Sequence, residues 1–361
     1  MVAFSDSLIL KDRLLVAIMA VSKIKSIRVL ARKLGISHTT VSDALRDNPR
    51  VSAKTREMVK RGAKEFGYEY NPLAGSIMSE IRRSSVGSFR GVAAVVDLES
   101  DQDRSTGAAT YHSLLLRGAT EAAGRLGFKV DHFVLGEEHI SLPRLNSILA
   151  SRGIRAVLFL PIKGSPATKE LDWDQLTGIY TDYLITDPAI HTVCPDHFRS
   201  MTIALRKLIE MGYQRPGLIL SEAHDRRLLF SWEAAFASYW SHTDHELTVP
   251  LLSNELNREE FIAWFQSTKP DVVLTHLPEV FHWMKEIGCK IPETHGFCCL
   301  NIVMTPLDAA GLDLQPKFGG SRAMELLISQ LQRNEYGIPE VPSTTTYAAK
   351  WKDGPTLRPQ S

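Results

Sequence analysis

The chain has 361 residues, of which 44% are hydrophobic and 23% are charged, and its formal net charge is +1. This length and balance predict a globular protein of two or three domains with a sizeable core. The small net charge argues against a protein that coats nucleic acid or covers a membrane surface along its whole length. No apolar run is long enough to cross a bilayer, so we expect no membrane partner.

The charge is unevenly distributed along the chain. Residues 23–83 hold 14 Lys and Arg against 6 Asp and Glu, whereas the rest of the chain holds 28 against 35. A basic segment on an acidic body is typical of a protein with one DNA-facing module, because only that module has to neutralise phosphates. A chance clustering of solvated charges gives the same counts, so the asymmetry needs a motif beside it.

The N-terminal segment and the cysteines bear on the compartment. Residues 14–21 form a short apolar run, but no clean basic region precedes it and no small-residue cleavage site follows. We interpret residues 1–22 as an N-terminal extension rather than a signal peptide, and a translation start at Met19 is the alternative. The four cysteines lack metal-binding spacing, and reduced thiols fit a cytoplasmic protein without a metal or other cofactor.

Three short helices are predicted over residues 26–68. Ser26 can cap the first helix, and Gly35 can supply the left-handed conformation that ends it. Ser37 can cap the second helix and Ser52 the third. The apolar residues of each helix recur at helical spacing, so we expect a small all-α module with its own core.

The first two helices have the pattern of a helix-turn-helix. Ala31 is the small residue four positions before Gly35, and it lets the two helices approach closely. The second helix of such a unit enters the major groove. A helical hairpin with solvated hydroxyls is the alternative for the bare pattern. The side chains expected to face the DNA are Ser37, His38 and Thr39 at base edges, and Thr40 and Ser42 at phosphates.

The composition changes after this module. A short amphipathic segment (73–83) is followed by the Ser- and Gly-rich linker SSVGS (84–88). Beyond it, strand-like runs alternate with helical segments, which predicts doubly wound parallel sheets that bind ligands at the carboxyl ends of their strands. The strand-like runs are residues 91–97, 128–135, 156–161, 216–221 and 271–276.

The stretch from Ser26 to Met78 resembles the headpiece and hinge of the lactose/galactose repressor (LacI/GalR) family. The matching motifs are TVS (40–42), NPRVSAKTRE (48–57), GY (67–68) and NPLA (71–74). The resemblance implies an all-α helix-turn-helix headpiece and an α/β core like a periplasmic binding protein, with two doubly wound subdomains. The implied boundaries are 23–70 for the DNA-binding headpiece, 71–88 for the hinge helix and linker, and 89–361 for the effector-binding and dimerisation core.

The resemblance also implies roles in DNA binding. His38 and Thr39 occupy the two positions that choose bases, and Asp43 stands where an arginine often reads guanine, so the operator should differ from those of better-known members. Ile77 falls where the family has a leucine that wedges into the minor groove; Met78 is an alternative wedge, and hinge packing is the alternative role. Further implied DNA contacts are Asn48, Ser52, Thr55 and Asn71.

Effector contacts are implied in the cleft between the two α/β subdomains. The implied residues are Asp97, Asp196, an arginine from the pair Arg226 and Arg227, His276 and Cys298. His276 and Cys298 replace an Asn and an Asp that grip hydroxyls, which weakens the expectation of an ordinary sugar. Trp232 is either a stacking platform or, in the favoured interpretation, a core aromatic residue. His197 is interpreted as a loop residue rather than a zinc ligand.

These features predict a cytoplasmic, homodimeric transcription repressor that binds a pseudo-palindromic double-stranded DNA operator and responds to a small-molecule effector, a sugar by resemblance. Both an inducer and a corepressor are compatible with the pattern. The alternative is a sugar-binding transport protein with the same core. We find no Gly-rich phosphate loop, nucleophile elbow or paired catalytic carboxylates, so we expect no catalytic residues and no enzyme.

Overall fold

The computed structural model describes residues 27–45, 47–48, 50–68, 89–99, 104–136, 140–162, 164, 167–183, 186–240, 242 and 248–359. The chain divides into two compact units, residues 1–88 and 89–361. The expected N-terminal extension (1–22) and the expected hinge and linker (71–88) lie outside the described residues. Within the described part, no helix combines the length and the apolar character needed to span a membrane.

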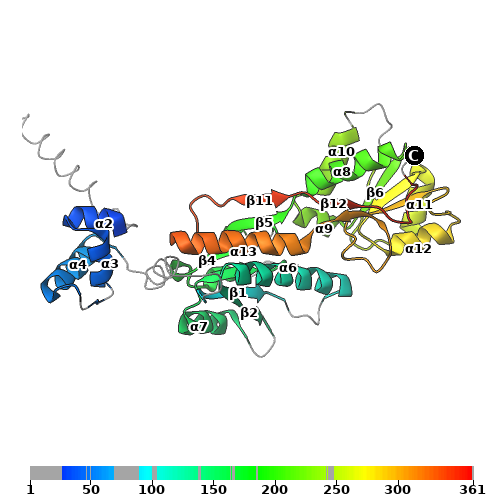
Figure 1. Ribbon diagram of the computed structural model, residues 1–361. Helices are drawn as coiled ribbons and strands as arrows, with labels where there is room; N and C mark the ends of the chain where they lie inside the picture. The colour runs from blue at the N-terminus through cyan, green and yellow to red at the C-terminus, as the bar shows by residue number, and fades with distance from the viewer. Residues whose placement is uncertain are drawn as a thin grey trace, which may run out of the picture. The chain divides into compact units, whose positions relative to one another are not determined.

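The first unit has three helices among its described residues (Figure 1): α2 (Ile27–Leu34), α3 (His38–Leu45) and α4 (Ala53–Glu65). Gly35 ends α2 with a φ of 66°, a left-handed conformation that glycine adopts without a steric penalty. The apolar sides of the helices meet in a core of buried side chains, namely Leu30, Ala31, Val41, Ala44, Val59 and Ala63. The expected helices and the turn between the first two are confirmed.

The second unit contains two six-stranded sheets. The first sheet has the order β11-β5-β4-β3-β1-β2, and all its neighbouring strands are parallel. Its strands are β1 (Gly91–Asp97), β2 (Phe128–Val134), β3 (Ala156–Phe159), β4 (Thr177–Tyr180), β5 (His191–Pro195) and β11 (Thr344–Tyr347). Apart from the two edge strands, β11 and β2, these strands are largely buried, because helices cover both faces of a parallel sheet.

The second sheet has the order β12-β10-β9-β8-β6-β7 and is parallel except for β12, which runs antiparallel to β10. Its strands are β6 (Pro216–Leu220), β7 (Leu251–Leu252), β8 (Val272–Thr275), β9 (Gly296–Cys299), β10 (Ala310–Asp313) and β12 (Lys350–Lys352). Each sheet therefore has the doubly wound character that the alternating pattern predicted, and the two together form the expected two-part core.

Helices pack around both sheets (Figure 1). The helices that accompany the first sheet are α6 (Thr106–Arg125), α7 (Leu142–Arg152) and α13 (Pro316–Arg333). Those that accompany the second sheet are α8 (His197–Glu210), α9 (Glu222–Arg227), α10 (Ser231–Trp240), α11 (Arg258–Thr268) and α12 (Glu279–Glu286). Two short 3-10 turns, Thr168–Glu170 and Trp173–Gln175, precede β4.

The chain passes between the two sheets three times: after β5 into α8, after β10 into α13, and from β11 to β12. Helices α6 and α13 pack directly against each other beside the first sheet (Figure 1). A Cβ on Gly118 of α6 would overlap the carbonyl of Lys317, and a Cβ on Gly320 of α13 would overlap that of Leu115. The two backbones approach this closely because these positions carry no side chain.

The five strand-like runs correspond to β1, β2, β3, β6 and β8, so these predictions are confirmed to within two residues. The other strands of the two sheets were not singled out by the sequence. All four cysteines are free and buried.

Candidate functional site

The second helix of the first unit, α3, presents short polar side chains at its N-terminus. Ser37 caps the helix: its Oγ accepts a hydrogen bond from the Thr40 amide at 3.0 Å and lies 2.8 Å from the Thr40 Oγ1. His38 and Thr39 are exposed, whereas Thr40 and Ser42 are half-buried. Because Val41 and Ala44 anchor the opposite side of the helix in the core, this polar end is held outward.

Two other predicted DNA contacts lie at the start of α4 and repeat the same arrangement. The Ser52 Oγ accepts a hydrogen bond from the Thr55 amide at 3.2 Å and lies 2.8 Å from the Thr55 Oγ1. Two capped helix starts therefore lie in one small module, and helix N-termini with hydroxyl groups suit backbone phosphates.

Asp43 and Asn48 interact with each other. The Asn48 Nδ2 donates to the Asp43 Oδ1 at 3.4 Å, and the Asn48 Oδ1 accepts from the Arg50 amide at 3.1 Å. Asp43 is half-buried, and its carboxylate accepts a hydrogen bond from the loop residue Asn48. The carboxylate is therefore not fully solvated. Its role as a base reader stays a prediction. Asn71 and Ile77 lie outside the described residues.

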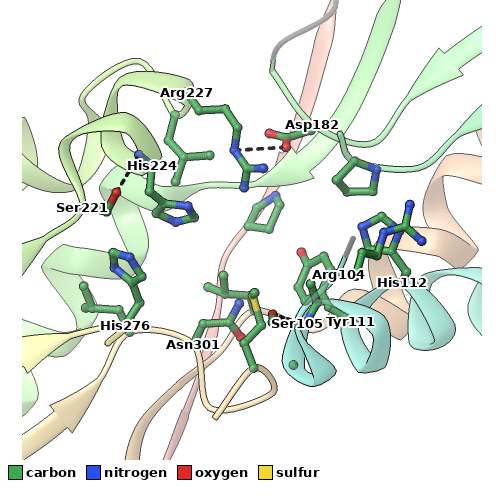
Figure 2. Close-up of a pocket in the computed structure, with 18 of the residues that line it drawn as sticks. Arg104, Ser105, Tyr111, His112, Asp182, Ser221, His224, Arg227, His276 and Asn301 are labelled. Atoms are coloured by element: carbon green, nitrogen blue, oxygen red, sulfur yellow. Dashed lines mark hydrogen bonds and ion pairs between the residues drawn. The ribbon is translucent and has the colours of Figure 1, made fainter. Parts of the chain in front are cut away.

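A cavity of about 700 Å³ lies in the second unit and is lined by residues from both sheets (Figure 2). Its volume is in the range of about 300–1,000 Å³ that small-molecule sites occupy. Most of the lining segments directly follow the carboxyl end of a parallel strand: Glu99 after β1, Asp182 after β4, His197 after β5, His224 after β6, His276 after β8 and Asn301 after β9. The cavity therefore lies at the carboxyl ends of the strands, where the sequence predicted a ligand site.

Asp97 holds two side chains that line one side of the cavity. Its carboxylate pairs with both Nη groups of Arg104 and lies 3.3 Å from the His112 Nδ1. Burial raises the pKa of Asp97, but hydrogen bonds from His112 and Arg104 outweigh burial and hold the pKa below its ordinary value. Asp97 does not line the cavity, whereas Arg104 and His112 do. Asp97, a predicted effector contact, therefore positions two side chains of the cavity lining and does not itself reach the cavity.

Three histidines and an arginine line another side of the cavity, and we call His197, His224, His276 and Arg227 the histidine cluster. Figure 2 labels three of them, His224, His276 and Arg227. The rings of His224 and His276 stack with centroids 4.4 Å apart. Burial, with a further contribution from the Arg227 charge, lowers the pKa of His197 to about 3 and that of His276 to about 4. The pKa of His224 is also well below its ordinary value, first through burial and then through His276. These imidazoles are therefore neutral at pH 7.

Arg227 is the permanent charge of the histidine cluster. Its Nε lies 3.6 Å from the Asp182 Oδ2, which is longer than a hydrogen bond, and its Nη1 donates to the Ile162 carbonyl at 3.4 Å. The Nε has no hydrogen-bond partner among the described residues. Burial raises the pKa of Asp182, and the Arg227 charge partly offsets this effect. The guanidinium thus keeps donor capacity that a ligand can use.

The structure corrects several predicted effector contacts. Cys298 is completely buried in the core of the second sheet and does not line the cavity. Asp196 caps α8 by accepting from the Arg199 amide at 2.8 Å, and Arg226 pairs with Glu222 on the outside of α9. Neither lines the cavity. Of the arginine pair, Arg227 is the one that reaches it, because successive helical residues point in different directions.

The structure also places Trp232 and His197, for which the sequence predicted a core position and a loop position. Trp232 is 2% exposed and packs in the core, as favoured, yet it also lines the cavity, where the His197 ring meets it edge-on at 5.0 Å. His197 is not a loop residue: it is the first residue of α8 and is 5% exposed. Helix α8 begins there because Asp196 provides the N-cap.

Sequence reasoning missed most of the polar lining, notably Arg104, His112, Asp182, His224 and Asn301. The sequence held a signal for three of these residues, namely His224, Asn301 and Arg104. His224 lies three residues before Arg227 on one helix face, and Asn301 ends the GFCCLN stretch just after a strand. An aspartate at the end of a buried strand, such as Asp97, needs a cationic partner, and Arg104 is that partner. Asp182 had no such signal, because β4 was not predicted.

Comparison with known proteins gives a consistent result. Residues 26–71 match the family model "Bacterial regulatory proteins, lacI family". The HTH-type transcriptional regulator CelR of Thermobifida fusca is 29% identical over 53% of this chain and 54% of its own, so that match spans about half of either protein. The HTH-type transcriptional regulator IpsA of Corynebacterium glutamicum is 24% identical over 88% of this chain and 94% of its own.

Solved structures share the fold. A transcriptional regulator CelR-cellobiose complex matches with a TM-score of 0.54 and 18% identity over 92% of this chain and 99% of that one. The lac repressor dimer bound to operator and the anti-inducer ONPF matches with a TM-score of 0.50 and 14% identity over the same shares.

Proposed function

Because this chain belongs to the lacI family of bacterial regulatory proteins, we propose that it is a DNA-binding transcription repressor whose affinity for a pseudo-palindromic operator is controlled by a small-molecule effector. The observation that carries the proposal is the helix-turn-helix unit in which α3 turns His38 and Thr39 outward on a basic module. An enzyme or a transport protein with the same core has no use for such a unit.

In the proposed complex, α3 lies in the major groove. Ser37, His38 and Thr39 meet base edges, while the capped start of α4 meets phosphates through Ser52 and Thr55. Exposed cations around the headpiece supply the electrostatic attraction: Arg32, Lys33, Arg50, Lys54, Arg61 and Lys64. A homodimer would place two such units on the two halves of the operator, and a regulator of this kind works in the cytoplasm, where the DNA is.

The effector binds in the cavity of the second unit. Its volume of about 700 Å³ and its position at the strand ends suit a small polar molecule. Carbohydrates are the expected class, since relatives with this fold are described in complex with cellobiose, ribose and glucose. The chain passes between the two sheets three times, and two of these crossings contribute residues to the cavity lining, so a ligand that contacts both sheets can change their mutual arrangement.

A gel-shift titration tests the DNA-binding part of this proposal. The full-length protein is titrated against fragments of the genomic region around its own gene, with a scrambled fragment of equal length and composition as the control. We expect one fragment to bind at least about tenfold more tightly than the control. Affinity for every fragment should fall steeply as salt rises, because phosphate neutralisation releases counterions.

Equal affinity for all fragments, or an affinity that salt does not change, would contradict the proposal. The effector part is tested in the same assay by adding mono- and disaccharides. An effector must change operator affinity, because a ligand with equal affinity for the two states shifts nothing.

A further inference from the structure

The histidine cluster brings more cationic and protonatable side chains than carboxylates to the cavity. Among the described lining residues there are two carboxylates, Glu99 and Asp182, and Asp182 already faces Arg227. None of the electrostatic interactions that shift the three buried histidines is with a carboxylate. The cluster therefore combines one permanent positive charge, which has Asp182 at 3.6 Å, with three imidazoles whose pKa no described carboxylate raises.

Three polar atoms of the cluster are unpaired among the described residues, and they belong to side chains that line the cavity. The Nδ1 atoms of His197 and His276 and the Nε of Arg227 have no hydrogen-bond partner among the described residues, although all three atoms are buried. His197 is 95% buried, because its exposed fraction is 5%. Buried polar groups are ordinarily hydrogen-bonded, and a set of unpaired groups around one cavity indicates a ligand that completes them.

We propose that the effector is a small anionic polyol, a sugar derivative with a carboxylate or a phosphate, and that the histidine cluster receives the anionic group. This inference rests on the proposed function and specifies its ligand. Arg227 supplies the fixed charge and its spare donor, and His197 and His276 donate hydrogen bonds from Nδ1. Hydroxyl groups of the same ligand reach Asn301 and Asp182 on the other lining segments.

Proton uptake follows from this arrangement. Burial and the Arg227 charge keep the imidazoles of His197 and His276 neutral at pH 7. An anion beside Arg227 offsets that repulsion and attracts a proton, so it raises the pKa of the imidazoles against burial, which is the larger cause of their low pKa, and favours proton uptake when the ligand binds. A neutral sugar would only add burial and would leave them neutral. Between about pH 6 and about pH 8, affinity for an anion should therefore rise as the pH falls, whereas affinity for a neutral sugar should not change.

Other titratable groups around the cluster do not replace this effect. Asp182 after β4 is paired with Arg227, and Asp225 on α9 accepts hydrogen bonds from the Trp232 and Glu233 amides. On α6, His112 is held by Asp97, and Tyr111 has a pKa that burial raises above its ordinary value. On the loop after β4, burial also raises the pKa of Tyr183, whose ring lies 5.8 Å from His197.

Isothermal titration calorimetry of the full-length protein tests the inference. The anionic probes are inorganic phosphate, glucose 6-phosphate and gluconate, and the neutral probes are glucose and cellobiose. Each is titrated in two buffers with different ionisation enthalpies. We expect at least one of the anionic sugars to bind about tenfold more tightly than either neutral sugar, with net proton uptake and with affinity that increases from about pH 8 to about pH 6. Gluconate against glucose 6-phosphate distinguishes a carboxylate ligand from a phosphate ligand.

Two variants locate the effect. Arg227→Met should lose the preference for anions, whereas Arg226→Met, on the same helix but outside the cavity, should keep it. His276→Asn should reduce the proton uptake while it preserves a hydrogen-bonding group. Imidazole NMR signals of the wild-type protein, followed in the presence and absence of phosphate, report the same uptake without requiring a tight ligand.

Neutral sugars that bind as tightly as the anions, or anions that leave every histidine titration unchanged, would overturn the inference. These outcomes are separable from the proposed function. A protein that fails to select any DNA fragment contradicts the regulator, whereas one that selects its operator but ignores anions contradicts only the ligand class.

Discussion

The headpiece and the cavity are built in opposite ways. The helix-turn-helix is contained in residues 27–68, and its core and its capped helix starts all come from neighbours in sequence. The cavity gathers residues from Glu99 to Leu314, which come from the ends of several strands and from helices and loops of both sheets. A local sequence pattern can therefore specify the first site, whereas the second exists only once both sheets have formed.

The two regions also differ in electrostatics. The headpiece places its charges in solvent, as in the Lys60–Asp47 pair with both side chains more than half exposed. Such pairs contribute little to stability. The cavity buries its charges, and the Asp97–Arg104 pair has side chains 3% and 1% exposed. Substitutions in the cavity should therefore change the stability of the core, and substitutions in the headpiece should change DNA recognition alone.

The largest expected effect comes from Asp97→Asn. It leaves Arg104 buried without its counter-charge, which should reduce the free energy of unfolding of the core by about 3–5 kcal/mol. Urea denaturation followed by tryptophan fluorescence measures this, since none of the tryptophans lies in the headpiece. Asp131→Asn breaks the exposed pair with Arg152 and serves as the control, with an expected loss below about 1 kcal/mol. Equal losses would show that the buried pair has no special role.

Gly118→Ala tests the close contact between α6 and α13. The new methyl group would overlap the Lys317 carbonyl, so we expect a loss of about 3 kcal/mol, at the upper end for overpacking. Gly124→Ala in the same helix meets nothing within 4 Å and is the matched control. It should stabilise the core by up to about 1 kcal/mol through helix propensity. A neutral Gly118→Ala would mean that the two helices separate without cost.

His38→Ala should affect recognition and leave both units folded. Loss of a base contact should reduce discrimination among operator variants by about 1–3 kcal/mol, while non-specific affinity stays nearly constant. Thr55→Ala is the contrasting variant, since a phosphate contact weakens binding to all sequences alike. Competition gel shifts with single-base operator variants measure both. A uniform loss in His38→Ala would remove this residue from base reading.

The pH dependence of core stability also tests the cavity. The pKa of His276 is about 4 in the folded protein and 6.5 ordinarily. Between these values the unfolded chain binds the proton and the folded chain does not, so stability falls as pH falls through this window, by about 1 kcal/mol per pH unit. Burial raises the pKa of Asp182 and Asp225, which acts in the opposite direction.

The variant His276→Asn isolates the histidine from these carboxyl groups. Thermal unfolding at a series of pH values should show a smaller loss toward acid in the variant than in the wild type. Parallel curves would show that His276 is not held neutral.

The headpiece, its caps and its turn could be predicted from the amino-acid sequence, because helical periodicity, Ser caps and Gly35 act within a few residues of one another. The doubly wound character of the core could be predicted too, because buried parallel strands are continuous apolar runs. Which polar side chains share the cavity became clear from the folded arrangement. Arg227 reaches it and Arg226 does not, Cys298 turns into the core, and Asp97 acts through Arg104 and His112. The direction of each side chain, and the strand ends that meet it, depend on contacts between residues that are distant in the chain.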